Sequence, residues 1–256
     1  MSMNCPLCSD TTPLPYGDYL KCSSCGLMFV PILASSRELM RSYTGGWFKS
    51  FRRKLFGGLR KFEAWGQYGE FMQKAYKIQS TIQNIVGDKK QINILDIGCN
   101  KGFLLSACIE KGWNVYGIEL VGELLTPFKN KYKDAAQNIH TGRFEDVYHK
   151  FNKDYFDVIT AIDVVEHFEN PFESIRNIKQ LLKPNGYFIV QTPDGDTSLS
   201  KKEGINWGAL KPMEHLFIFN RNNFSRLAQN AGFNKTQNIT AFDDADGNFA
   251  VVLTDR

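Results

Sequence analysis

The segment from Ile92 to Gly102, INILDIGCNKG, constrains the fold more than any other part of the chain. A short apolar run of this kind is typical of a buried strand, and it breaks into a glycine-containing turn just before a helical pattern begins at Phe103. Glycine lets the backbone close around a ligand without a Cβ atom in the way, and the start of the next helix offers unpaired N–H groups. The segment therefore predicts a nucleotide-cofactor site at the carboxyl end of a strand.

The turn resembles the first motif of class I S-adenosylmethionine-dependent methyltransferases, in which an acid is followed by glycines at alternate positions. The matching residues here are Asp96, Gly98, Asn100 and Gly102, and Cys99 lies within the cofactor loop. Asn100 stands where the middle glycine is usual, and asparagine tolerates a left-handed backbone better than other side chains. The resemblance implies an α/β fold with a Rossmann-like, doubly wound, seven-stranded sheet, and S-adenosylmethionine as the cofactor.

An acid at the end of the next strand strengthens this interpretation. The run Val115 to Glu119 ends about twenty residues beyond the loop, where a carboxylate can accept both hydroxyls of a ribose. We therefore expect Glu119, followed by Leu120, to bind the adenosine of the cofactor. An NAD-binding domain predicts the same strand, loop and acid, but its GxGxxG pattern, counted from Gly98, would need glycine at Asn100 and at Phe103.

Downstream segments follow the same family in order, so that the resemblance covers about residues 90–256. Phe144 and Glu145 follow a predicted strand at residues 138–142, and the resemblance implies that they hold the adenine. The apolar run from Tyr155 to Asp163 reads as a strand buried on both faces and brings Ile162 to the cofactor. A helix to Leu182, a Lys-Pro-Asn-Gly turn at 183–186 and a strand at 187–191 are expected after it.

Two CxxC pairs near the N-terminus predict a metal site. Thirteen residues separate the pairs, whose members are Cys5, Cys8, Cys22 and Cys25. Four thiolates in two tight turns can converge tetrahedrally on zinc, and such a closed site folds a segment rather than performing chemistry. We therefore expect a structural zinc ribbon over residues 1–32, a helical lid and linker over 33–90, and a cofactor-binding domain over 91–256.

The linker contains a basic and aromatic stretch at residues 39–62, which holds seven basic residues, six aromatic residues and no acid, whereas the formal net charge of the chain is only +4. Such a surface suits a phosphate-bearing substrate, an anionic membrane face or nucleic acid, and a lid with merely solvated charges is the alternative. No apolar run is long enough to span a membrane and no secretory leader is evident, so we expect a soluble, cytoplasmic protein.

Two histidines are candidates for catalysis. Asp163, Glu166 and His167 have the spacing of one helical turn, which would place them on one face at the mouth of the site. They resemble a segment of quinone-biosynthesis O-methyltransferases that implies a divalent metal; a histidine that orients a loop is the alternative. His215 lies in a stretch resembling methyltransferases encoded with surface-glycan enzymes, and we expect it to act as a base or a substrate contact.

The sequence therefore predicts a methyltransferase that uses S-adenosylmethionine, with O-methylation of a sugar or glycan precursor as the leading function. A quinone or lipid phenol O-methyltransferase at a membrane surface is the alternative, and an enzyme that modifies RNA or protein is a further one. A nucleic-acid substrate is disfavoured by the modest net charge and by the lack of an Asn/Asp-Pro-Pro-aromatic tetrad after the fourth strand.

Overall fold

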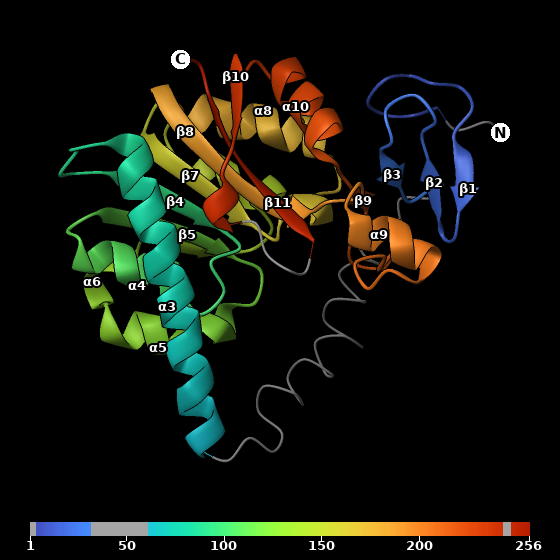
Figure 1. Cartoon of the computed structure of the whole chain (residues 1–256). Coiled ribbons are helices and arrows are strands. Elements are labelled where there is room, and N and C mark those ends of the chain that lie inside the picture. The colour runs from blue at the N-terminus through green and yellow to red at the C-terminus, as the bar shows by residue number, and fades with distance from the viewer. Residues whose placement is uncertain (1–3, 32–60, 243–246) are drawn as a thin grey trace.

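A seven-stranded sheet forms the centre of the computed structural model, which describes residues 4–31, 61–242 and 247–256 (Figure 1). The strand order is β10-β11-β8-β7-β4-β5-β6. The first four strands of this sheet in chain order are β4 (Asn93–Ile97), β5 (Asn114–Glu119), β6 (Ile139–Thr141) and β7 (Phe156–Ile162). The remaining three are β8 (Leu182–Pro193), β10 (Lys235–Asn238) and β11 (Asn248–Thr254).

The sheet is doubly wound, as the sequence predicted. Strands β4 to β8 pair in parallel, and β11 runs antiparallel between β8 and β10. The order reverses at β4, because β5 and β6 extend the sheet to one side of it whereas β7 and β8 extend it to the other. Such a switch point leaves an open crevice at the carboxyl ends of the strands, where ligands of α/β proteins bind.

Helices cover both faces of the sheet. On one face, α3 (Lys61–Val86) and α4 (Phe103–Glu110) bury Ile82 and Leu105 against the strands. On the other face, α7 (Phe144–Val147), α8 (Pro171–Leu181) and α10 (Arg221–Asn230) contribute residues such as Ile175 and Phe224 to a second apolar layer. The shorter helices are α5 (Thr126–Lys131), α6 (Lys133–Ala136) and α9 (Ser198–Glu203), with 3₁₀ turns η2 (Gly122–Leu125), η3 (Tyr148–Lys150), η4 (Val165–His167), η5 (Gly204–Asn206) and η6 (Thr240–Phe242).

A second, small antiparallel sheet includes three strands of the N-terminal cysteine segment, which is residues 4–31. Its order is β1 (Leu14–Tyr16), β2 (Tyr19–Lys21), β3 (Met28–Phe29) and β9 (Phe217–Ile218). The fourth strand therefore comes from the far end of the chain, and β3 pairs with it through Met28 opposite Ile218 and Phe29 opposite Phe217. In Figure 1 the blue N-terminal strands lie beside the orange β9. The segment is attached to the larger domain by main-chain pairing as well as by side-chain packing.

Two local expectations differ from the structure or fall outside it. Strand β8 begins at Leu182 rather than at 187, and the expected Lys-Pro-Asn-Gly turn lies inside it as an irregularity between the paired residues Leu182 and Tyr187. Asn185 there has a φ of 61°, which accommodates the extra residues without ending the strand. Residues 39–60 of the basic aromatic stretch lie outside the described residues. Within the described residues, no helix combines the length and the apolar character needed to cross a membrane.

Candidate functional site

The glycine loop follows β4 in a tight conformation that only certain residues permit. Gly98 has a φ of 74°, and a Cβ atom there would lie 2.5 Å from Cγ2 of Val164. Asn100 has a φ of 49°, so the residue that replaces the middle glycine adopts the left-handed backbone that its type predicted. The amides of Gly98 and Cys99 both donate to the carbonyl of Ile118 at 2.8 and 3.0 Å, which holds the loop against β5.

Glu119 lies at the end of β5 and faces this loop. Its Oε2 accepts from the backbone N–H of Asn100 at 2.8 Å, and its Oε1 accepts from the N–H of Val121 at 2.9 Å. Burial raises the pKa of the Glu119 carboxyl, while these backbone donors oppose the shift. Each carboxylate oxygen has a second lone pair, so the group can accept two hydroxyls of a vicinal diol while it keeps its place.

Asp96 lies in β4, just before the glycine loop. The hydroxyl of Thr160 on the neighbouring strand β7 donates to Asp96 Oδ1 at 2.7 Å. Burial, with a smaller contribution from the nearby Glu119, raises the pKa of Asp96 to about 7, while the hydrogen bond from Thr160 opposes the rise. An Asp that is close to half-protonated at neutral pH can both donate and accept hydrogen bonds, which suits it to a polar group of a charged ligand.

These residues open onto one cavity with a volume of about 550 Å³, the size of a small-molecule site. Its wall includes every cofactor-binding residue predicted from the sequence except Gly102, whose role is to let the turn pass close to Phe128. The predicted residues that line it are Asp96, Gly98, Cys99, Asn100, Glu119, Leu120, Phe144, Glu145 and Ile162.

Helix α7 and the segment after β7 form a further part of the cavity wall. The ring of Phe144 is buried and lies 5.8 Å from that of Phe168 between centroids, so it forms a wall. Glu145 Oε1 accepts from the backbone N–H of Glu169 at 3.2 Å. Arg143 makes ion pairs with Asp146 and with Glu169. Arg143 and Glu169 line the cavity, and neither is predicted from the sequence.

Helix α3 supplies a wall that the sequence analysis also missed. Phe71, Lys74, Ala75 and Ile78 of this helix line the cavity. Their spacing of three, four and seven residues is that of one helical face, which is the signal that could have identified them. Phe71 stacks on Phe103 with an interplanar angle of 12° and a centroid distance of 5.3 Å, and it is still 48% exposed. Tyr68 meets the same ring edge to face. The cavity therefore has an aromatic mouth.

The two candidate catalytic histidines lie together although they are distant in the sequence. The rings of His167 and His215 meet edge to face with centroids 4.9 Å apart. Nδ1 of His167 is 2.8 Å from the carbonyl oxygen of Glu214, and Nδ1 of His215 is 2.8 Å from that of Ala209. A carbonyl can only accept, so each Nδ1 carries the proton and each neutral ring has its lone pair on Nε2.

The environment keeps both rings neutral. Burial lowers the pKa of His167, and burial together with the neighbouring His167 lowers the pKa of His215 to about 3. His167 lines the cavity, whereas His215 lies behind it and is buried. A neutral imidazole at the wall can accept a proton from a bound hydroxyl group.

The expected grouping of Asp163, Glu166 and His167 on one helical face is wrong. The segment forms the 3₁₀ turn η4 rather than an α-helical turn, and Asp163 precedes it with a φ of 55°. Asp163 is consequently exposed, whereas Glu166 is fully buried. The potential ligand atoms that do converge, all within 4.8 Å of one another, belong to Glu166, His167 and His215.

Glu166 is the most unusual member of this group. Its Oε2 accepts from the hydroxyl of Thr192 at 2.9 Å, while its Oε1 is buried and has no hydrogen-bond partner among the residues that the structure describes. Burial is the main cause that raises the pKa of Glu166 to about 8. A neutral carboxyl or a positive partner would each relieve the cost of placing this group in the interior.

The four N-terminal cysteines also converge. Sγ of Cys5 lies 3.6 Å from Sγ of Cys25, and Sγ of Cys8 lies 3.4 Å from Sγ of Cys22. Zinc–sulfur bonds of about 2.3 Å in a tetrahedron place the sulfurs roughly 3.8 Å apart, so the four sulfurs already have nearly the spacing that zinc requires. The donor set and the geometry both fit a structural zinc ion.

Comparison with known proteins identifies the family. Residues 68–238, which are more than half of the chain, match the model of a methyltransferase domain family. The chain belongs to this family.

Curated relatives and solved structures agree with this assignment. The chain is 30% identical over 149 residues to a ubiquinone biosynthesis O-methyltransferase from Rickettsia typhi, covering 52% of this chain and 59% of that protein. It is 32% identical over 120 residues to the enzyme of the same name from Haemophilus ducreyi, covering 45% and 49%. The matches thus span only about half the length of these relatives.

Among solved structures, a SAM-dependent methyltransferase from Archaeoglobus fulgidus has a TM-score of 0.58 at 16% identity, with 82% of this chain and all of that chain covered. A putative O-methyltransferase from Nostoc punctiforme has a TM-score of 0.55 at 17% identity, covering 85% and 71%. The fold is therefore that of the S-adenosylmethionine-dependent methyltransferases.

Proposed function

We propose that this member of the methyltransferase domain family transfers the methyl group of S-adenosylmethionine to a phenolic oxygen of an aromatic acceptor. The observation that carries the proposal is a cavity whose wall combines the glycine loop and Glu119 with the stacked rings of Phe71 and Phe103. The polar side suits the adenosine of the cofactor, and the aromatic mouth suits a flat, apolar acceptor.

The relatives favour this acceptor over a sugar. Their names describe O-methyltransferases of ubiquinone biosynthesis, so the phenolic alternative has more support than the glycan precursor that the sequence analysis placed first. The exposed face of Phe71 would stack on an aromatic ring and leave Tyr68 to cover an attached apolar chain. The contact of residues 39–60 with a membrane or another anionic surface stays a prediction.

The proposed chemistry needs few side chains. Methyl transfer is an in-line displacement at a sulfonium carbon, so the protein mainly aligns the two reactants and excludes water. A phenol must lose its proton to become a good nucleophile. His167 lines the cavity and accepts that proton at Nε2, because its Nδ1 already bonds the carbonyl of Glu214, while His215 contacts its ring from behind.

We further propose that Cys5, Cys8, Cys22 and Cys25 hold a structural zinc, because their sulfurs nearly form the required tetrahedron. In this arrangement residues 1–32 fold around the metal, and residues 91–256 with α3 carry methyl transfer.

The test is a choice between acceptors. Purified protein is given S-adenosylmethionine with a labelled methyl group and either a catechol bearing a prenyl chain or a nucleotide sugar. Label is expected in the catechol, and the product is identified by mass spectrometry. Phe71→Ala should raise KM for the prenylated catechol several-fold and leave binding of S-adenosylhomocysteine unchanged, with the exposed Met213→Ala as a matched control outside the cavity. Label in the sugar alone would reject the phenolic acceptor.

A further inference from the structure

The N-terminal cysteine segment is bonded to the part of the chain that carries His215. The backbone N–H of Val30, just after β3, donates to the carbonyl of Leu216 at 3.0 Å. On its other side, the N–H of Leu216 donates to the carbonyl of Glu166 at 2.8 Å. Leu216 therefore links the cysteine segment to η4, and η4 carries the other candidate histidine, His167.

Tyr19 makes a direct contact with the main chain of His215. Its hydroxyl donates to the carbonyl oxygen of His215 at 2.7 Å, and the side chain is only 2% exposed. The ring packs with Met28, Trp207 and Ile218 in a small apolar cluster. The buried Tyr19 hydroxyl donates its one proton to this carbonyl. Breaking the hydrogen bond would leave both the hydroxyl and the carbonyl unsatisfied in the interior, so the contact holds the carbonyl in place.

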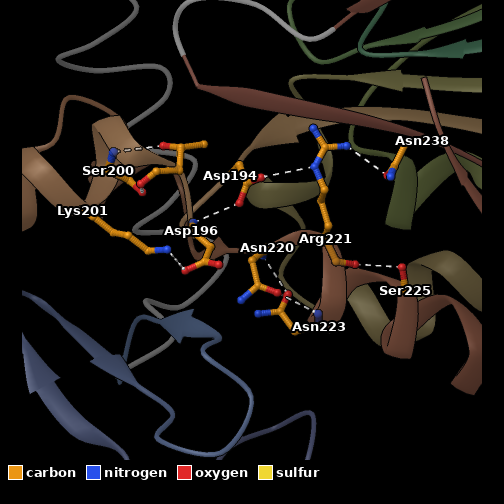
Figure 2. A network of polar contacts seen from close by, with 10 residues as sticks. Asp194, Asp196, Ser200, Lys201, Asn220, Arg221, Asn223, Ser225 and Asn238 are labelled. Carbon is orange, nitrogen blue, oxygen red and sulfur yellow. Dashed lines mark hydrogen bonds and ion pairs between the residues drawn. The ribbon is translucent and has the colours of Figure 1, made fainter. Parts of the chain in front are cut away.

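The second CxxC turn, Cys22 to Cys25, also contacts the chain near His215. The carbonyl of Cys25 accepts from the side-chain amides of Asn223 at 3.3 Å and Asn220 at 3.5 Å. These two asparagines form the capping box at the start of α10, immediately after β9 (Figure 2). A Cβ atom on Gly26 would lie 2.9 Å from Nδ2 of Asn220, so the CxxC turn and the cap are in close contact.

The contacts before and after β9 thus join the four-cysteine site to the main chain of residues 215–223. Tyr19 holds the stretch at His215, β3 holds it at residues 217–218, and Cys25 holds it at the cap of α10. The ring of His215 is further restrained by its Nδ1 bond to the carbonyl of Ala209 and by its edge-to-face contact with His167. The orientation of the imidazole therefore depends on where the cysteine segment places this main chain.

We propose that Tyr19 is a positioning residue for His215, and that metal binding by the four cysteines sets the place of this histidine in the methyltransferase site. The consequence for turnover rests on the proposed function, in which one of the paired histidines accepts the proton of the acceptor. The coupling itself is independent of the acceptor. It requires only that loss of the metal loosens the second CxxC turn, which carries the Cys25 carbonyl, and strand β2 just before it, which carries Tyr19.

The experiment follows the imidazole nitrogens directly. Full-length protein labelled with ¹⁵N-histidine and loaded with zinc is compared by NMR with Tyr19→Phe and Tyr16→Phe, and His215→Gln identifies the signal of His215. Tyr16 is the matched control, since it pairs with Tyr19 and packs on the same apolar cluster, but its hydroxyl makes no hydrogen bond to His215 among the described residues. His149, which is exposed in η3, is the internal reference.

The expected result is a shift of the His215 nitrogen signals in Tyr19→Phe and no shift in Tyr16→Phe. The signal of His149 should stay in place in both. Removal of zinc by a chelator should move or broaden the signals of His215 and His167, and re-addition of zinc should restore them. Turnover in Tyr19→Phe should fall roughly threefold to tenfold in kcat with little change in KM, as the loss of one buried hydrogen bond implies.

Binding of S-adenosylhomocysteine separates the failures. Within the described part of the chain, no residue that lines the cavity belongs to the cysteine segment, so Tyr19→Phe should bind this ligand as the unmodified protein does. Unchanged His215 signals in Tyr19→Phe, in protein that still binds S-adenosylhomocysteine, would overturn the positioning role. Unchanged signals after zinc removal would overturn the link to the metal. Failure of the unmodified protein to bind S-adenosylhomocysteine would instead reject the proposed function. If the metal-free protein unfolds, the zinc-loaded Tyr19→Phe variant still decides the positioning role.

Discussion

The imidazoles of His167 and His215 meet edge to face with their centroids 4.9 Å apart, and each ring donates from Nδ1 to a backbone carbonyl. The sequence alone suggests each histidine as a separate candidate, His167 as part of an acidic cluster and His215 as a base. The structure makes them one unit, with the buried carboxyl of Glu166 beside them. A proton bound by one ring therefore lowers the pKa of the other, since two like charges at this distance repel.

Replacement of the histidines separates their roles. His215→Ala should lower kcat about a hundredfold if this ring is the base, and it should leave S-adenosylmethionine affinity nearly unchanged, because a base acts in the transition state. His167 lines the cavity, so His167→Ala should lower kcat and also change the KM for the acceptor. Steady-state kinetics with calorimetric cofactor binding measure both. Full activity in both variants would show that alignment alone suffices.

A divalent metal at the histidine pair is a competing scheme. In that case activity should vanish with a chelator that leaves the four-cysteine zinc in place, and added magnesium or zinc should restore it. Glu166→Gln should then remove the response, whereas Asp163→Asn should keep it, because Asp163 is exposed and lies outside the converging group. Metal content is measured in parallel. Activity that is indifferent to the chelator would exclude this scheme.

Cofactor binding should depend on the glycine loop and on Glu119. Gly98→Arg places a side chain where a Cβ atom already meets Val164, so binding of S-adenosylhomocysteine should be lost. Glu119→Ala removes the acceptor of the ribose hydroxyls and should weaken binding roughly tenfold to a hundredfold. Isothermal titration calorimetry with S-adenosylhomocysteine measures both. The exposed Asp134→Asn, in α6 and outside the cavity lining, serves as a control, and tight binding of NAD in place of S-adenosylhomocysteine would refute the cofactor assignment.

The buried acid Asp96 predicts a pH dependence of stability. Burial raises its pKa from 3.8 to about 7, so the folded protein holds a proton that the unfolded chain releases above pH 3.8. The stability that this proton contributes is present below pH 3.8 and is lost as the pH rises through about 7. Asp96→Asn should therefore gain stability relative to the unmodified protein between pH 4 and pH 7.5, by up to about 4 kcal/mol.

Denaturant unfolding of the two proteins at a series of pH values measures this difference. Histidines with lowered pKa values act in the opposite direction, because their contribution is lost as the pH falls below about 6.5. Both proteins contain these histidines, so the difference between the two curves cancels them. A difference that does not change with pH would contradict the raised pKa of Asp96.

The cysteine site should bind one zinc ion per chain, which elemental analysis can count. Cys22→Ser combined with Cys25→Ser should abolish the zinc and lower the melting temperature, because a structural metal contributes to folding directly. Cys99→Ser is the control, since this cysteine lies in the cofactor loop instead. Zinc that persists in the double variant would place the ligands elsewhere.

Local patterns in the sequence determined the class of fold and most of the cofactor side of the cavity. The apolar strand, the glycine loop, the left-handed backbone at Asn100 and the acid Glu119 are all set within a span of about thirty residues, where neighbours in sequence are neighbours in space. The four cysteines were recognisable for the same reason, because metal ligands in two knuckles depend on local spacing.

Contacts between distant segments were decided only by the tertiary structure. The pairing of His167 with His215, the wall supplied by Phe71 and the bond from Tyr19 to His215 each join elements that the sequence keeps far apart. The predicted group of Asp163 with Glu166 failed because a left-handed residue and a 3₁₀ turn replace the expected helical turn. Periodicity describes one element at a time, whereas a site at the junction of two sheets is fixed by how those elements pack.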